Sequence, residues 1–199
     1  MIKLAKIISF LLGPTFVLLP IPYILVSKFT NNNFYALKWA IFSYAFVVFV
    51  GIFVVLGVFL GVFTNFDVSK KGQRPIFFSL LAFTMFCYFI SLVILSAPMI
   101  LFFGIFSLFL GLIAIIIVTK WIKASIHIAV LVSVIFLIWF AYKENYYFLF
   151  SFVPILAWAR IKSKEHTLQE TIIGGFLGAI VTLSIYLVAK HFLLGMIYN

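Results

Sequence analysis

Two histidines and a small group of basic and acidic side chains stand out in a 199-residue chain of which only 9% is charged. They fall in three short polar stretches, residues 64–75, 120–127 and 160–170, set between long apolar runs. Ionisable groups among apolar segments are costly to desolvate and usually mark a functional site. These three stretches are therefore the candidates for a functional site.

The side chains in the three stretches suit phosphoryl transfer. Positioned Arg and Lys side chains stabilise the negative charge that spreads over the transferred phosphoryl oxygens. A histidine can attack phosphorus and hold a phospho-intermediate when a neighbouring group orients its ring. His166 and Glu170 are four residues apart and would share one face of a helix. A second histidine, such as His127, could protonate a leaving alkoxide.

The order of the stretches resembles the three motifs of the type 2 phosphatidic acid phosphatase superfamily, a family of integral membrane lipid phosphatases. The family pattern is K-x6-R-P, then P-S-G-H, then S-R-x5-H-x3-D. In the third motif the spacing from Arg160 to His166 agrees, Glu170 stands at the aspartate position, and Ala159 stands at the serine position. Gly174 fits the glycine that often follows. The resemblance covers roughly residues 60–180.

The other two motifs match in part. The second keeps Ser125 and His127, while the other family positions hold Ala124 and Ile126. The first keeps Arg74-Pro75 but has Asp67 at the lysine position, and a cation could come instead from Lys70 or Lys71.

The resemblance implies a role for each matching residue. His166 would be the nucleophile, Glu170 the acid that orients it, and His127 the general acid that later activates water. The family uses no metal ion, so the resemblance implies no metal and no other cofactor. The residues expected to bind the substrate phosphate are Arg74, Ser125, Arg160, Lys70, Lys71 and Lys123.

The composition predicts an integral membrane protein. Hydrophobic residues make up 66% of the chain, and the mean hydropathy is +1.32. About 20 helical residues cross a hydrocarbon layer of about 30 Å, and several apolar runs reach that length. We expect an all-α, polytopic transmembrane bundle of six to seven spans that forms a single domain over residues 1–199, with a phosphatase-like core over about 60–180.

Seven runs are candidate crossings, separated by breaks such as Lys143-Glu144-Asn145 and the tight hairpin expected at Ser96-Ala97-Pro98. The sixth run is short for a crossing. The candidate crossings are residues 7–27, 36–63, 76–95, 97–119, 124–142, 146–159 and 171–196.

The charge distribution bears on partners and orientation. The chain has 14 Lys and Arg against 4 Asp and Glu, and in an apolar chain this excess favours anionic lipid headgroups or phosphate over nucleic acid. If all seven runs cross, the three stretches share one side with the N-terminus. The positive-inside rule would make that basic side cytoplasmic, but a phosphate site would also concentrate positive charge. We expect a multi-pass protein of the cell (cytoplasmic) membrane.

The predicted reaction is hydrolysis of a lipid phosphomonoester or prenyl pyrophosphate through a phosphohistidine. Candidate substrates are phosphatidate, phosphatidylglycerophosphate and polyprenyl pyrophosphate. Two alternatives stay open. A degenerate member of the family would act as a membrane scaffold or transporter. A magnesium-dependent membrane prenyltransferase is suggested by Asn65-Phe66-Asp67, but it needs several aspartates, and the chain has only four acidic residues.

Overall fold

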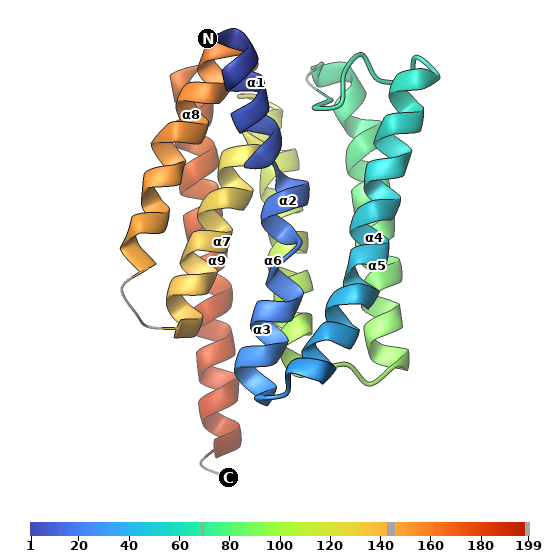
Figure 1. Ribbon diagram of the computed structural model, residues 1–199, viewed down its shortest axis with the longest axis vertical. Coiled ribbons are helices and arrows are strands. Elements are labelled where there is room, and N and C mark those ends of the chain that lie inside the picture. Colours follow the sequence, from blue (N-terminus) through green and yellow to red (C-terminus); the bar gives the residue numbers. More distant parts are fainter. Residues whose placement is uncertain (69, 143–145, 198–199) are drawn as a thin grey trace. The chain divides into compact units, whose positions relative to one another are not determined.

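The computed structural model describes residues 1–68, 70–142 and 146–197, and the regular elements in these ranges are all helical (Figure 1). The predicted all-α class is therefore confirmed for them. The α-helices are α1 Ile2–Leu11, α2 Pro14–Leu18, α3 Ile21–Thr30, α4 Asn33–Phe59, α5 Arg74–Ile94, α6 Met99–Thr119, α7 Ile126–Tyr142, α8 Phe152–Lys162 and α9 Leu168–Ile197. Two 3₁₀ turns, η1 Lys71–Gln73 and η2 Tyr146–Ser151, precede α5 and α8.

Five segments are long and apolar enough to cross a membrane: Ile2–Thr30, Asn33–Phe59, Lys71–Ile94, Met99–Thr119 and Leu168–His191. They coincide with five of the seven predicted crossings. The fifth predicted crossing is α7, an apolar helix of 17 residues, and the sixth contains η2 and part of the 11-residue α8. Both helices are shorter than the 20 or so residues that a crossing needs. The predicted break at Lys143-Glu144-Asn145 lies outside the described residues.

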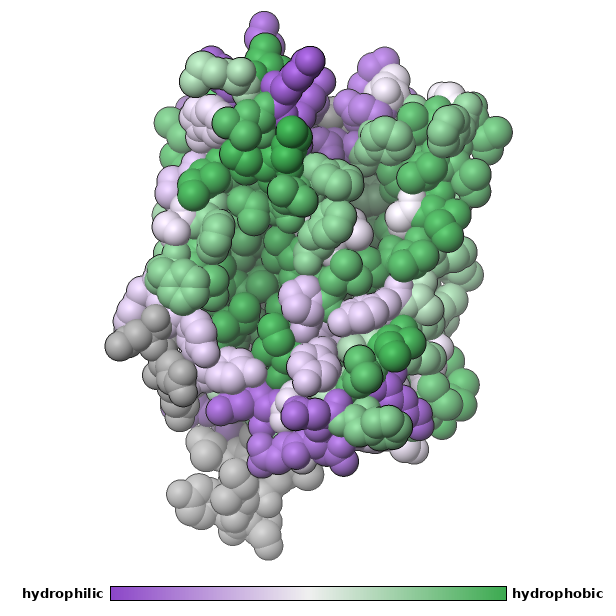
Figure 2. Space-filling view, viewed as in Figure 1, coloured by the Kyte–Doolittle hydropathy of each residue, from purple (hydrophilic) through white to green (hydrophobic). Residues whose placement is uncertain are grey.

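The surfaces of the long helices are those of a protein surrounded by lipid. At most 28% of any candidate span is buried against other parts of the protein. Large hydrophobic side chains such as Phe59, Phe83, Phe176 and Ile180 are each at least 60% exposed. Figure 2 shows hydrophobic residues over the middle of the helices and hydrophilic residues gathered near their ends. Exposed apolar surface on this scale requires a bilayer around it.

The first apolar run is one predicted crossing but three short helices. The α1 helix ends before Gly13, whose N–H donates to the Phe10 carbonyl at 3.0 Å. Pro20 then provides the N-cap position of α3. Proline has no N–H to continue a helical ladder, so the break before α3 follows from the sequence.

By their internal contacts, the described residues divide into two compact units. One comprises Leu19–Leu112, and the other combines Met1–Leu18 with Ile113–Asn199. In the Leu19–Leu112 unit, α3 packs on α4, and Trp39, Leu92 and Ile105 belong to its core. The expected hairpin between α5 and α6 is present, with Ser96 at φ +50° and the Ala97 N–H donating to the Leu92 carbonyl at 2.9 Å.

In the other unit, hereafter the terminal unit, α9 packs directly on α7 because glycines lie at the contact. A Cβ at Gly174 would lie 2.5 Å from the Ser125 carbonyl oxygen, and one at Gly178 would clash with the carbonyl oxygen of Ala129. The Ser133 hydroxyl donates to the Gly178 carbonyl at 3.1 Å. Small residues four apart let two membrane helices approach closely, and Gly174 and Gly178 are such a pair on α9.

The glycine contact gives a matched pair of stability variants on α9. We expect Gly178→Ala to destabilise the protein by about 1–3 kcal/mol, because its methyl group would be forced into the backbone of α7. Gly175→Ala is the control: its Cβ would lie 3.6 Å from Ile128 Cγ2, an ordinary contact, and alanine favours the helix by up to about 1 kcal/mol. Thermal unfolding in detergent measures both, and equal stability of the two variants would contradict the close contact.

Candidate functional site

The turn between α8 and α9 sets the spacing of Arg160 and His166. The α8 helix ends at Lys162, and the Arg160 carbonyl accepts the N–H groups of Glu165 at 3.1 Å and His166 at 3.3 Å. Lys164 takes the left-handed conformation, with φ +60°, that often ends a helix. These bonds fold the five intervening residues into a compact cap and hold the backbone of His166 close to that of Arg160.

Thr167 and Glu170 form a capping box at the start of α9. The Thr167 hydroxyl accepts the Glu170 N–H at 3.3 Å, while Glu170 Oε2 accepts the Thr167 N–H at 3.1 Å. This reciprocal pair satisfies two N–H groups that a helix start leaves without partners. The sequence T-x-x-E predicts this capping box directly. The box holds the carboxylate of Glu170 beside His166, the residue that precedes Thr167.

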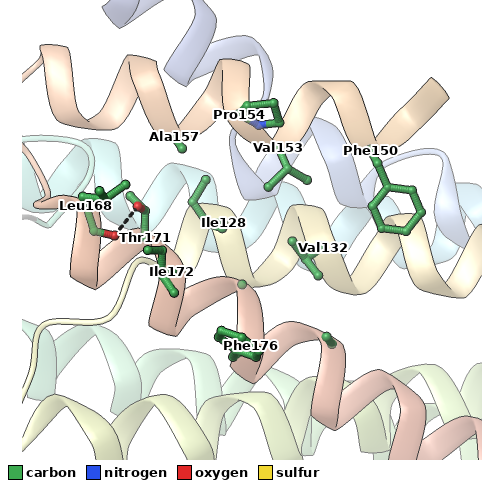
Figure 3. Close-up of a pocket in the computed structure, with 12 residues that line it drawn as sticks. Ile128, Val132, Phe150, Val153, Pro154, Ala157, Leu168, Thr171, Ile172 and Phe176 are labelled. Carbon is green, nitrogen blue, oxygen red and sulfur yellow. Dashed lines mark hydrogen bonds between the residues drawn. The ribbon is translucent and has the colours of Figure 1, made fainter. Parts of the chain in front are cut away.

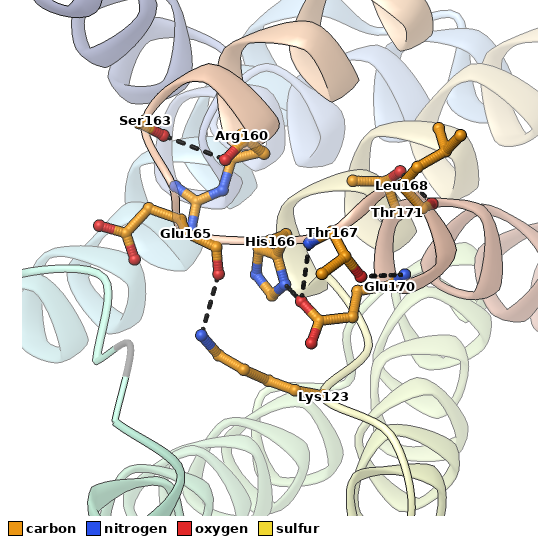
Figure 4. A network of polar contacts seen from close by, with 9 residues as sticks. All are labelled: Lys123, Arg160, Ser163, Glu165, His166, Thr167, Leu168, Glu170 and Thr171. Atoms are coloured by element: carbon orange, nitrogen blue, oxygen red, sulfur yellow. Dashed lines mark hydrogen bonds and ion pairs between the residues drawn. The ribbon is translucent and has the colours of Figure 1, made fainter.

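The Glu170 carboxylate also contacts the His166 ring, with 2.7 Å between Oε2 and Nδ1 (Figure 4). An ionised carboxylate only accepts, so Nδ1 carries the proton in this contact and donates it. The other ring nitrogen, Nε2, then keeps its lone pair. The predicted pairing of His166 with Glu170 is thus present, in the tautomer that nucleophilic attack requires.

Burial and nearby cations keep His166 neutral. Desolvation lowers its pKa most, the Arg160 guanidinium and the Lys123 ammonium lower it further, and Glu170 opposes them, so that the pKa falls from 6.5 to about 4. The side chain of His166 is only 3% exposed. At neutral pH the ring is therefore uncharged, and its free nitrogen is available as a nucleophile or an acceptor.

Arg160 is held by a residue from the far end of the sequence. Its Nη1 donates to the Ser9 hydroxyl of α1 at 2.7 Å, and both residues are buried. The α1 helix packs along α8 to make this contact. Sequence reasoning missed Ser9, because no local spacing links it to Arg160. The only available signal was a hydroxyl on an otherwise apolar helix face.

The start of α7 is tied to the start of α9. The Ser125 N–H donates to the Glu170 carbonyl at 3.0 Å, and the backbone of Ser125 lies against Gly174. Ser125 is fully buried, and its hydroxyl makes no hydrogen bond to another described residue. Buried hydroxyl groups usually have a partner, so this one is available to a ligand oxygen.

Lys123 and His127 flank Ser125. The Lys123 ammonium donates to the Glu165 carbonyl at 2.9 Å, so it lies beside the turn that carries His166 (Figure 4). His127 is the second residue of α7 and is partly buried. Its Nε2 would lie 3.6 Å from a Cβ at Gly13, so the ring reaches the junction of α1 and α2. The N-terminal segment therefore contacts residues from two of the predicted motifs.

The first predicted motif belongs to the Leu19–Leu112 unit. Arg74 is the first residue of α5 and is 3% exposed, while Lys70 and Lys71 are exposed beside η1. Gln73 closes this loop by accepting from the N–H and the hydroxyl of Thr64, each at 3.1 Å. A role for these three cations in the same site remains a prediction.

The terminal unit thus gathers Lys123, Ser125, Arg160, His166 and Glu170 around the start of α9. A neutral imidazole oriented by a carboxylate, with two cations and a buried hydroxyl nearby, can attack an electrophile whose negative charge the cations stabilise. Over the described ranges, no three His, Cys, Asp or Glu side chains gather as a set of metal ligands.

Comparisons with protein-family models, curated proteins and solved structures give no match to this chain.

The electrostatics predict the titration of His166. In ¹³C-histidine NMR of the protein in micelles, we expect a midpoint near pH 4. Glu170→Gln should lower it further, because Glu170 raises the pKa of His166. Since the unfolded ring titrates near 6.5, this group makes stability fall as the pH drops from about 6.5 to 4. A midpoint near 6.5 in the folded protein would contradict the buried, cation-flanked site.

Proposed function

We propose that this protein is a membrane lipid phosphatase that hydrolyses a phosphomonoester or pyrophosphate without a metal ion. The single observation that carries the proposal is the buried His166, whose Nδ1 contacts Glu170 at 2.7 Å and whose pKa is lowered by burial and by Arg160. A neutral, oriented histidine next to cations is what attack on a phosphoryl group needs. The apolar spans of the chain favour a substrate that stays in the bilayer.

In the proposed first step, His166 Nε2 attacks phosphorus and the bond from phosphorus to the leaving oxygen breaks. His127 gives its proton to that oxygen, which leaves as the lipid alcohol or, from a pyrophosphate, as the lipid phosphate. Arg160, Lys123 and the Ser125 hydroxyl stabilise the phosphoryl oxygens. Each contributes most where negative charge develops in the transition state.

In the proposed second step, the neutral His127 takes a proton from water. The resulting hydroxide attacks phosphorus, the bond from phosphorus to His166 breaks, and inorganic phosphate leaves. Glu170 holds the His166 ring in one tautomer through both steps. The proposed chemistry applies to a terminal phosphoryl group on a lipid and does not by itself choose among phosphatidate, phosphatidylglycerophosphate and polyprenyl pyrophosphate.

The test is phosphate release by the detergent-purified protein from these three lipids, with EDTA present. We expect release by the wild type, none by His166→Ala, and a loss of about 10²–10⁴-fold in His127→Ala, the range that general acid–base groups contribute. Lys162→Gln is the matched control, since Lys162 is an exposed cation at the end of α8, and it should keep full activity.

Three outcomes would overturn the proposal. Release that survives the loss of His166 would exclude the phosphohistidine route. No release from any of the lipids would favour a degenerate member acting as a scaffold or transporter, and activity that appears only with Mg²⁺ would favour prenyl transfer.

A further inference from the structure

The terminal unit contains an apolar groove of about 470 Å³ between α8 and α9, with α7 as its floor (Figure 3). Ile128 and Val132 of α7 are buried in the floor, while Leu168 and Phe176 of α9 form an exposed rim. The only polar side chain in the lining is Thr171, and its hydroxyl donates to the Leu168 carbonyl at 2.7 Å. The groove therefore offers van der Waals contact and almost no free hydrogen-bonding group.

One end of the groove adjoins the candidate site. Leu168 and Thr171 lie in the first turn of α9 on either side of Glu170, and Ala157 precedes Arg160 by one turn of α8. Figure 3 places Leu168 and Ala157 at one end and Phe150 at the other. The groove therefore begins at the same end of α8 and α9 as the candidate site.

The length of the groove corresponds to one leaflet. Its lining on α9 runs from Leu168 to Ala179, which is about 16 Å of helix at 1.5 Å per residue. The hydrocarbon layer is about 30 Å thick, so a chain from one leaflet extends through about half of it. A polar ligand would lose its hydrogen bonds to water in such a groove, whereas a hydrocarbon chain has no polar group to be left without a partner.

We propose that this groove binds one hydrocarbon chain of the substrate lipid and thereby aligns its phosphate with His166. The inference rests on the proposed function and adds to it a specificity for chain length. Small residues set the depth of the groove: Gly175 in the middle, where a Cβ would lie 3.6 Å from Ile128 Cγ2, and Ala179 near the far end. A long chain reaches Ala179, and a chain of six carbons stops short of it.

The first experiment compares kcat/KM for dihexadecanoyl and dihexanoyl phosphatidate. Ala179→Leu should lower the ratio of long-chain to short-chain kcat/KM by about tenfold or more, since a methylene misfit in an apolar pocket costs at least that much. Gly175→Leu, nearer the site, should lower both values. Ile180→Phe adds bulk to the neighbouring exposed position outside the groove and should leave the ratio unchanged.

The second experiment needs no turnover. Hexadecyl phosphate carrying a diazirine at its terminal carbon is irradiated with the protein in vesicles, and the labelled residues are mapped by mass spectrometry. We expect labels near Val132, Phe150 and Ala179, and their loss in Ala179→Leu. In the control, hexadecane that carries the diazirine but no phosphate group is added, and it should not compete with hexadecyl phosphate for labelling of these residues.

The outcomes separate the two proposals. Hydrolysis with an unchanged chain-length ratio in Ala179→Leu, or labels spread evenly over the lipid-facing helices, would overturn the groove and leave the phosphatase intact. Labelling confined to the groove without hydrolysis of any lipid would overturn the phosphatase while supporting a binding site for the chain of a phosphorylated lipid.

Discussion

The candidate site depends on one carboxylate that makes two contacts. Glu170 Oε2 accepts the Thr167 N–H, which caps α9, and it contacts Nδ1 of His166, which orients the ring. The same group therefore starts the helix and selects the tautomer of the residue beside it. Because the helix cannot begin elsewhere without losing this bond, the position of His166 is coupled to the folding of the longest helix in the described chain.

Close packing between helices of the terminal unit places the other residues of the candidate site. Gly174 and Gly178 let α9 lie against the backbone of α7, and Ser125 donates its N–H to the Glu170 carbonyl as a result. On the other side, α1 approaches α8 until Ser9 meets Arg160. The cations and the hydroxyl are thus placed by helix contacts rather than by long loops.

Much of this could be predicted from the sequence because the signals are local. The four-residue spacing predicts the contact of His166 with Glu170, the glycine pair predicts the close helix contact, and the apolar runs predict the long helices. The short α7 and α8 were harder to foresee, because hydropathy counts apolar residues and does not report where a helix ends. The contact of Ser9 with Arg160 links residues 151 apart, so only tertiary structure reveals it.

The apolar groove could not be read from sequence for a related reason. Leu168, Gly175 and Ala179 recur on α9 at helical spacing, as they would on any helix that packs or faces lipid. What makes them a groove is the separation of α8 from α9 over a floor supplied by α7. The groove begins at the first turn of α9, where Glu170 lies, so it extends away from a polar site, as the proposed lipid substrate would require.

The most direct test of the proposed mechanism is a search for a phosphoryl group on the protein after it is mixed with a candidate lipid. The protein is mixed with phosphatidate labelled with ³²P in the phosphate group, quenched within milliseconds in alkali, which preserves phosphohistidine, and digested for mass spectrometry. The account predicts a transient phosphoryl group on His166 that is absent from His166→Ala. A phosphoryl group on any other residue, or steady hydrolysis by His166→Ala, would contradict it.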